Sequence, residues 1–351
     1  MRRRYRTSVT VLLLFVAVAT FAGQRVLSAQ TPPCPSSGQW AGLPVYDHVV
    51  IVVEENKDYV EIIGQQPGAA PYINTVLKRE GASFTKMFAE QHPSEGNYFW
   101  LFSGKNHDVN FNDKIPANKI SDGNVATALM KCGRSFKGYA EDLPQKGSDV
   151  EFAPAGCKPF SGSHPCRYAR KHVPWISFDN IPGDATTWHL PFTDFPTDFS
   201  SLPTVAFVIP NLENDMHDGK LPKSIQTGDG WLETKLGPYY RWAKNHNSLL
   251  IVTVDENHDR SGMHRLTDPA KLQNKDMENR VATIFAGAHI KAGEYPECNT
   301  DKHVCGVTHV NVLRTIEAMY GLAKSGAQQP RAAAFGITDD FLIRDVFKAG
   351  E

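Results

Sequence analysis

The sequence predicts an α/β fold in which a mainly parallel central sheet carries helices on both faces. The first observation is that two runs, 49–53 and 249–254, consist almost entirely of valine, isoleucine and leucine. Such runs are typical of parallel strands that are buried on both faces of a sheet. The second observation is that strand and helix signals alternate along the chain, which is the order of βαβ units.

Local signals predict the other elements in turn. Pro71 and Gly81 bracket a helical pattern over 71–80, and Asp229 stands where it could cap a helix that continues to Ala243. Further expected elements are an aromatic helix over 94–102, a helix over 309–320 that ends at a glycine, and strands over 48–54, 83–89, 136–140, 204–209, 249–254 and 281–286.

One segment breaks the alternation. Residues 143–201 contain eight prolines and little periodic pattern, so we expect an irregular insertion, and long insertions of this kind are often functional. Its aromatic residues fit either the core, which we expect for most of them, or an apolar substrate rim: Phe152, Phe160, Trp175, Phe178, Trp188, Phe192, Phe195 and Phe199. With this insertion, residues 30–351 are expected to form a single domain.

The N-terminus has the pattern of a secretory signal peptide over residues 1–29. Four arginines within the first six residues precede an apolar segment over 9–23, and Leu27-Ser28-Ala29 is a plausible cleavage site. An uncleaved anchor is the alternative, but the apolar segment is short for a permanent span. We expect a secreted or periplasmic protein without a stable membrane span after cleavage.

The charge balance excludes one class of partner. The whole chain has 37 Lys and Arg against 38 Asp and Glu, and signal cleavage would remove five of the basic residues. An acidic mature chain argues against a nucleic-acid groove and gives no support for adhesion to anionic membranes.

All six cysteines lie after the expected cleavage site. An even number in an exported chain indicates disulfides. The expected pairs, two of them local and one left by elimination, are Cys157–Cys166, Cys298–Cys305 and Cys34–Cys132. The paired CxxC spacing of a zinc ribbon does not occur, so a structural zinc site is not expected.

Carboxylates follow two of the predicted strands directly. Glu54-Glu55-Asn56 comes after the first strand, and Asp255-Glu256-Asn257 comes after the strand at 249–254. In open α/β sheets, ligands bind outside the carboxyl ends of the strands. Several carboxylates at one edge repel one another unless a cation lies between them, and oxygen ligands suit a hard or borderline metal ion.

A third segment, residues 91–98, follows a strand and opens a helix. Ser94 stands at the start of that helix, where free N–H groups and the helix dipole favour an anionic group and help an alkoxide to form. Serine is also one of the commonest helix caps. On this segment alone, a helix cap is the stronger interpretation of Ser94, although one serine can be both a cap and a nucleophile.

The loop over 211–219 also follows a strand, at 204–209. Asp215, His217 and Asp218 could ligate a metal, bind phosphoryl oxygens or act as an acid, or they could be solvated charges around an Asp-Gly turn. Weaker candidates, each equally compatible with a structural role, are His107, His172 and His309.

Taken together these segments resemble a phosphoesterase family that contains bacterial phospholipases C and acid phosphatases, within the alkaline phosphatase superfamily. The similarity extends from residue 46 to about residue 322, and it depends on the order and spacing of motifs that are each weak alone. The matching pieces, in order, are Glu55-Asn56, 70–74, His92-Pro93-Ser94 with Asn97-Tyr98, 102–104, 210–211, 215–218, 228–232, 254–256, 308–310 and 313–317.

The resemblance implies an alkaline-phosphatase-like fold and a metal-assisted hydrolysis of phosphate esters through a phosphoserine. It implies Ser94 as the nucleophile. The other roles that it implies are metal ligation by Glu55, Asn56, Asp255 and Glu256 with a divalent ion of unidentified type, catalytic contacts by Asn97, His107 and His217, and substrate binding by Asp215 and His309. Glu54 and Asn257 become neighbours of the site.

Two departures affect specificity. Many relatives have a Ser-x-Pro-Asn pattern where this chain has Gly96, and a glycine-rich run where it has residues 257–262, so His258 or Arg260 could reach the substrate. The segment after Ser94 lacks the proline and arginine of formylglycine sulfatases. We expect an acid-phosphatase-type enzyme that acts on a small phosphate ester. A phospholipase C or other phosphodiesterase acting on a phospholipid, and an inert exported binding protein, are the alternatives.

Overall fold

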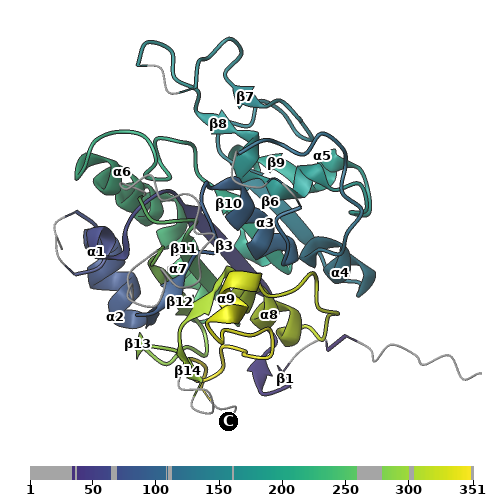
Figure 1. The fold of residues 1–351 in the computed structure, drawn as a ribbon, viewed down its shortest axis with the longest axis vertical. Helices are drawn as coiled ribbons and strands as arrows, with labels where there is room; N and C mark the ends of the chain where they lie inside the picture. The colour runs from purple at the N-terminus through teal and green to yellow at the C-terminus, as the bar shows by residue number, and fades with distance from the viewer. Residues whose placement is uncertain are drawn as a thin grey trace, which may run out of the picture. The chain divides into compact units, whose positions relative to one another are not determined.

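A β-sheet of eight strands forms the centre of the described part of the chain (Figure 1). The computed structural model describes residues 34–35, 38–64, 69–107, 109, 113–159, 162–258, 279–299 and 304–348, all within the compact unit Cys34–Glu351. The expected signal peptide over 1–29 and Arg260 lie outside the described residues. In order across the sheet, the strands are β13 (Gly293–Tyr295), β4 (Ala82–Phe84), β12 (Thr283–Gly287), β11 (Ser248–Val254), β3 (His48–Glu54), β10 (Val205–Ile209), β6 (Phe136–Ala140) and β9 (His189–Pro191).

The sheet is mostly parallel, as the sequence predicts. From β11 to β9 neighbouring strands pair in parallel, whereas β12 runs antiparallel to β11 and to β4. All residues of β10 and β11 are buried, and so is β3 apart from its first residue. Strands that are buried throughout must be covered on both faces, which explains their uninterrupted apolar runs.

The pairing register fixes where the functional segments emerge. Val254 at the end of β11 pairs with Glu54 at the end of β3, and Val208 of β10 pairs with Val52 of β3. Three neighbouring strands therefore end at one edge of the sheet. This edge receives the two carboxylate segments and the loop that follows Ile209.

Helices cover the sheet. α3 packs against α4 and α8, and α7 packs against β11 and β12 (Figure 1). Their bounds, with those of the shorter helices, are α1 (Tyr59–Ile62), η1 (Ile73–Leu77), α2 (Lys78–Glu80), α3 (Glu95–Ser103), α4 (Val125–Lys131), η2 (Arg170–His172), η3 (Pro174–Ser177), α5 (Ala185–Trp188), η4 (Phe192–Asp194), η5 (Phe199–Ser201), α6 (Lys223–Trp231), η6 (Leu232–Leu236), α7 (Gly237–Ala243), α8 (His309–Met319) and α9 (Pro330–Ala334). The short strands are β1 (Gln39–Trp40), β2 (Leu43–Pro44), β5 (Met87–Phe88), β7 (Phe152–Ala153), β8 (Tyr168–Ala169), β14 (Cys298–Asn299), β15 (Val304–Cys305) and β16 (Val307–Thr308).

The predicted elements are present with small shifts, and two expectations change. The expected strand over 83–89 is split into β4 and β5. Asp229 lies inside α6 and does not start a helix of its own. Its carboxylate instead accepts hydrogen bonds from the backbone N–H groups of Tyr72 (2.9 Å) and Ile73 (2.8 Å), so it caps the distant helix over 71–80. A cap supplied by another element cannot be recognised from local sequence.

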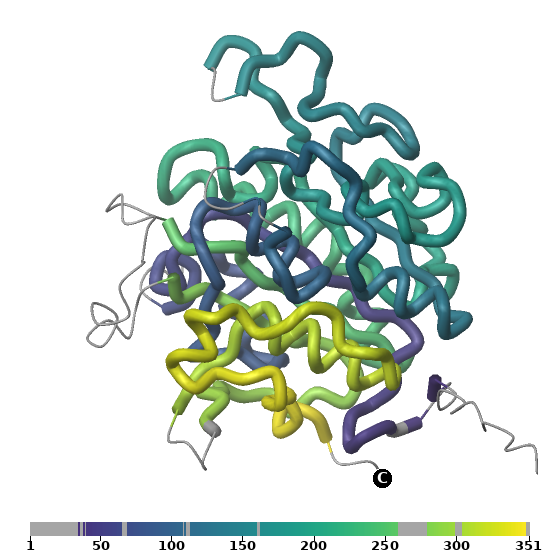
Figure 2. Tube along the Cα trace, turned by 45° about the vertical axis from the view of Figure 1, so that its right-hand side comes forward, coloured from purple at the N-terminus to yellow at the C-terminus, as the bar shows by residue number. Residues whose placement is uncertain are grey.

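The insertion over 143–201 is more ordered than the prolines suggest. It supplies β9 at the edge of the sheet and several short helices, and β7 pairs with β8 in an arm at the top of Figure 2. Trp175, Phe178 and Trp188 are buried, and three further phenylalanines pack against the core: Phe192, Phe195 and Phe199. The core interpretation of these aromatic residues is confirmed; Phe160 is outside the described residues.

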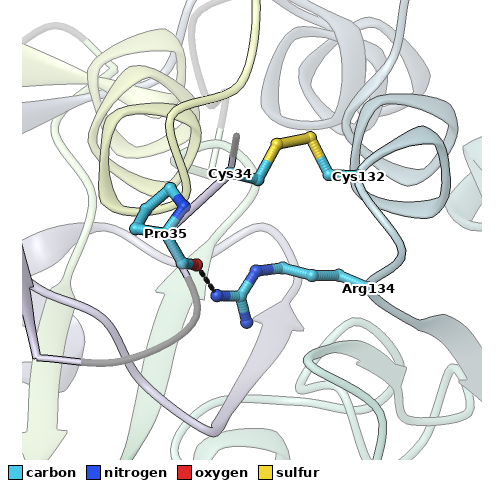
Figure 3. The surroundings of a disulfide bond; sticks show 4 residues. All are labelled: Cys34, Pro35, Cys132 and Arg134. Atoms are coloured by element: carbon cyan, nitrogen blue, oxygen red, sulfur yellow. Dashed lines mark hydrogen bonds between the residues drawn. A yellow bond between two sulfur atoms is a disulfide. The ribbon is translucent and has the colours of Figure 1, made fainter. Parts of the chain in front are cut away.

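The three expected disulfides form. They join Cys34 to Cys132, Cys157 to Cys166 and Cys298 to Cys305. The first links positions 98 residues apart, and beside it Arg134 donates a hydrogen bond to the carbonyl of Pro35 (Figure 3). Two local loops and one long-range connection are thus fixed covalently. Across the described ranges, none of the helices has the length and apolar character needed to cross a membrane.

Two glycines of α6 differ in their surroundings. A Cβ atom on Gly228 would overlap the side chain of Met216 and lie 2.9 Å from the carbonyl oxygen of Asn214, whereas a Cβ on Gly230 would meet no atom within 4 Å. Gly228 therefore allows the helix to approach the loop over 211–218.

We predict opposite effects for alanine at these two positions. Gly228→Ala should lower the free energy of unfolding by about 1–3 kcal/mol because the loop must move. Gly230→Ala should raise it by up to about 1 kcal/mol because alanine favours the helix. Urea unfolding of both variants tests this, and equal stabilities would contradict the close approach at Gly228.

Candidate active site

Backbone hydrogen bonds join the three strand ends. The N–H of Glu55 donates to the carbonyl of Asp215 (2.6 Å), the N–H of Asp255 donates to the carbonyl of Glu54 (2.9 Å), and the N–H of Asn56 donates to Oδ1 of Asp255 (3.0 Å). The segments that follow β3, β11 and β10 are therefore held against one another. This arrangement brings the two predicted carboxylate pairs into one site.

Ser94 faces these carboxylates. Its hydroxyl donates to Oε2 of Glu55 at 2.9 Å and lies 3.5 Å from Oε1 of Glu256, and the residue is only 1% exposed. The Ser94 side chain makes no capping hydrogen bond to α3. The N–H of Glu95 is instead satisfied by Oδ1 of Asp113 at 2.9 Å. The Ser94 hydroxyl therefore points at the acids and not at the first turn of α3.

Asn97 joins the loop that precedes Ser94 to Glu256. Its side-chain oxygen accepts from the N–H groups of Glu90 (3.1 Å) and Gln91 (3.0 Å). Its amide nitrogen donates to the carbonyl of Gln91 at 2.9 Å and to Oε2 of Glu256 at 3.3 Å. A Cβ at position 96 would overlap the side chain of Gln91. Glycine at this departure from the family pattern therefore makes room for Gln91.

Two further residues contact Glu55, although the sequence indicates no role for Tyr98 and makes His172 only one of the weaker candidates. Tyr98 donates a hydrogen bond to Oε1 of Glu55, and the Nε2 atom of His172 lies 3.2 Å from the same oxygen. The two rings stack with their centroids 5.0 Å apart. The sequence offers only the tyrosine of the motif and a weak Lys-His pair inside the insertion. A histidine 117 positions from Glu55 carries no local signal that it will contact that residue.

Asp215 and His217 also belong to the site. Asp215 is fully buried; its Oδ1 accepts from the N–H of His217 at 2.8 Å, and its Oδ2 lies 3.8 Å from Nδ1 of His172. The His217 ring faces Asp218, with Nδ1 2.8 Å from the carboxylate. His217 also lowers the pKa of Glu55 through its charge, which is consistent with a position beside the carboxylates.

The two other predicted histidines occupy different surroundings. His107 lies beyond the C-terminal end of α3, where Nε2 is 2.7 Å from the hydroxyl of Ser103 and Nδ1 is 3.4 Å from Asp122. His309 is buried at the start of α8, with Nδ1 2.9 Å from Glu90 and Nε2 2.9 Å from the carbonyl of Val254. Their proposed contacts with substrate remain predictions. Through the contact with Val254, His309 helps to hold the end of β11 in place.

Burial makes the acidic centre electrostatically unfavourable. Desolvation, followed by the charge of Asp255, raises the pKa of Glu55 to about 8. Burial raises the pKa of Asp255 and of Asp215 well above the usual range, with Glu256 and Glu55 as the respective next causes. These groups bind protons readily because they share a small, dry space.

Several oxygens at this edge have no protein partner. Oδ1 of Asn56 and Oδ2 of Asp255 are buried and accept no hydrogen bond among the described residues. An amide oxygen and a carboxylate oxygen in such a position are suitable ligands for a cation. In the part of the chain that the structure describes, however, no three His, Cys, Asp or Glu side chains form a group that could hold a metal ion. The three carboxylates of the predicted ligand set, Glu55, Asp255 and Glu256, therefore do not form such a group, and metal binding at this edge stays a prediction.

Comparisons with known proteins identify the family of this chain. The profile of the Phosphoesterase family matches residues 73–323. A phosphatidylinositol-3-phosphatase of Mycobacterium tuberculosis is 41% identical over 314 residues, which cover 89% of each chain. A phosphate-repressible acid phosphatase of Penicillium chrysogenum is 28% identical over 291 residues, which cover 80% of this chain and 60% of the fungal protein.

The comparison with solved structures concerns the fold. A solved structure of an alkaline phosphatase superfamily protein from Vibrio parahaemolyticus matches with a TM-score of 0.52 at 11% identity, covering 82% of this chain and 69% of that protein. The alkaline-phosphatase-like fold expected from the motifs is thus confirmed, and an inert binding protein is the wrong alternative. The chain belongs to the Phosphoesterase family and is a hydrolase that acts on phosphate esters.

Proposed function

We propose that this protein is a secreted, metal-dependent phosphatase of acid-phosphatase type that uses Ser94 as its nucleophile. The observation that carries the proposal is the position of the Ser94 hydroxyl, which is 2.9 Å from Glu55 and 3.5 Å from Glu256 and does not cap its helix. A serine used only as a cap would turn its hydroxyl to a backbone N–H group of α3.

The proposed reaction has two steps. The oxygen of Ser94 forms a bond to phosphorus as the bond from phosphorus to the alcohol oxygen breaks, and the alcohol leaves with a proton. Water then cleaves the phosphoserine, which releases phosphate and restores the hydroxyl. Asn97 and His217 are the candidates for contacts with the phosphoryl oxygens or the leaving group, where charge develops. The Asp215 carboxylate accepts a hydrogen bond from the backbone N–H of His217 and so helps to hold His217 in position.

We propose that residues at this edge of the sheet bind a divalent metal ion. The proposed ligands are Glu55, Asn56, Asp255 and Glu256, with Ser94 beside them. Buried oxygens without partners on Asn56 and Asp255 support this set, as does the raised pKa of Glu55. When bound, such an ion lowers the pKa of the serine hydroxyl and withdraws charge from a phosphoryl oxygen.

The substrate that we propose is a phosphomonoester. The relatives named acid phosphatase and phosphatidylinositol-3-phosphatase support a monoester, whether a soluble ester or a phosphorylated lipid headgroup. An apolar rim for a phospholipase C would need exposed aromatic side chains, but the described aromatic residues of 170–201 are buried or pack against the core. A phosphodiesterase is therefore the second candidate.

The disulfides support export. Three disulfides are typical of an oxidising compartment. We propose that residues 1–29 are removed as a signal peptide and that residues 30–351 act as a single phosphoesterase domain. The N-terminal sequence of the exported protein tests the cleavage site.

The catalytic prediction concerns Ser94 and Asp255. Ser94→Ala and Asp255→Ala should each lose hydrolysis of p-nitrophenyl phosphate by at least about a thousandfold, because the first lacks the nucleophile and the second lacks a ligand. Circular dichroism checks that both variants are folded. Full activity in either folded variant would refute the mechanism.

A second prediction separates a site tyrosine from a structural one. Tyr98 and Tyr240 each donate a hydrogen bond to a glutamate, to Glu55 and to Glu80 respectively. Tyr98→Phe should lower kcat/KM by about 10–100-fold, because Glu55 loses the partner that orients it. Tyr240→Phe should leave kcat/KM within about twofold. Equal effects of the two changes would contradict an orienting role for Tyr98.

Metal removal should destabilise the fold. A metal ion whose free concentration is 100 times its Kd raises the free energy of unfolding by about 2.7 kcal/mol. Dialysis against a chelator should therefore lower Tm by several degrees, and adding a divalent ion should restore it. Asp255→Asn should abolish this response, whereas Asp340→Asn, at an exposed carboxylate, should retain it. An unchanged Tm in the wild-type protein would contradict a metal at this site.

A further inference from the structure

Lys171 lies beside the nucleophile turn without belonging to the family motifs quoted for the site. Its Nζ atom is 2.5 Å from Oδ2 of Asp113, and its side chain is 14% exposed. The other oxygen of the same carboxylate accepts the N–H of Glu95, the residue after Ser94, at 2.9 Å. A single carboxylate therefore ties the lysine to the first turn of α3.

The residue after Lys171 fixes the lysine from its other side. His172 is 1% exposed, lies 3.2 Å from Glu55 and stacks on Tyr98. Because consecutive Cα atoms are about 3.8 Å apart, the backbone of Lys171 stays beside that of His172, while Asp113 holds the ammonium group. Burial opposes the charged form of Lys171, but the charges of Asp113, Glu55 and Asp255 outweigh it and raise its pKa.

A second lysine at this edge, Lys57, is too enclosed to contact a substrate. Lys57 is 4% exposed and donates to the carbonyl of Asn56 at 3.1 Å. Burial lowers its pKa. Lys57 is thus enclosed behind the segment after β3, whereas Lys171 is partly exposed beside the helix that carries Ser94.

We propose that Lys171, held by Asp113, is the residue that selects phosphomonoesters over phosphodiesters. The inference rests on the proposed function and names its substrate class. A phosphomonoester carries between 1.5 and 2 negative charges near pH 7, and a phosphodiester carries one. A fixed ammonium group beside the nucleophile binds the additional charge, and lysine is a regular phosphate-binding residue of this point-charge type.

Asp113 holds the Lys171 ammonium group in a defined position and leaves some of its N–H donors for other contacts. A lysine ammonium group has three donors, and Asp113 uses one of them in the described structure. The remaining donors can turn to a phosphoryl oxygen. Asp113 is a positioning residue in this scheme, because it acts on the substrate only through Lys171 and the start of α3.

The experiment compares two substrates in three variants. Lys171→Met removes the charge and retains a long unbranched side chain, and Lys171→Arg retains the charge. Lys158→Met is the matched control, because Lys158 is an exposed lysine of the same insertion. kcat/KM is measured for p-nitrophenyl phosphate and for bis-p-nitrophenyl phosphate, with thermal unfolding as the check of folding.

Lys171→Met should lower kcat/KM for the monoester by at least about tenfold, because one charge contact is lost in a partly buried site. It should change the diester value by less than about threefold. The inhibition constant for inorganic phosphate should rise in parallel with the monoester loss. Lys171→Arg should retain most of the selectivity, and Lys158→Met should match the wild-type protein.

Equal losses on both substrates in a folded Lys171→Met variant would overturn the proposal, because a lysine that only supports the fold affects both reactions alike. An unchanged phosphate inhibition constant would overturn it as well. If this variant does not fold, the neutral pair Lys171→Gln with Asp113→Asn takes its place, and the same two readouts decide. Failure of the proposed function is a separate result, since it appears as activity in Ser94→Ala.

Discussion

The accumulation of buried negative charge at one edge of the sheet is the constraint on which the rest of the site depends. Glu55, Asp215 and Asp255 are each no more than 1% exposed, and burial raises the pKa of all three. Backbone N–H groups and the hydroxyls of Ser94 and Tyr98 donate hydrogen bonds to these carboxylates and make the arrangement tolerable. The proposed function depends on the same arrangement, because a divalent cation would relieve the repulsion between crowded carboxylates.

The sheet makes this crowding possible through its register. β11, β3 and β10 end together, so segments that are far apart in the sequence share one edge. The backbone hydrogen bonds between Glu55 and Asp215 and between Asp255 and Glu54 then hold the segments in place. Regular strands thereby position an irregular site, which is the usual division of work in open α/β folds.

The start of α3 separates two roles of Ser94 that compete in the sequence. Ser94 has the residue type and the position of a helix cap. In the structure Asp113 accepts the N–H of Glu95, and the Ser94 hydroxyl turns to Glu55. The same device recurs at the helix over 71–80, where Asp229 supplies the cap from α6. The N-terminal N–H groups of both helices thus donate hydrogen bonds to carboxylates of other elements.

The sequence by itself determined the α/β class, the main strands, the three disulfide pairs and the family. Each of these depends on a local or ordered signal: apolar runs, cysteine spacing, and motifs in a fixed order. The sequence also indicated that Glu55, Asn56, Asp255 and Glu256 should meet, because parallel strands end at the same edge. Ser94 entered through the motif order, with its role as a cap still open.

Only the tertiary structure decided which side chains surround that edge. His172 and Lys171 come from an insertion that has no periodic pattern, and Asp113 acts across 18 positions on a backbone N–H group. The structure also placed His309 behind the end of β11, with both ring nitrogens in contact with protein atoms. Contacts of this kind depend on packing between segments that are distant in the sequence. Local sequence patterns do not predict them, because each residue type occurs in many different environments.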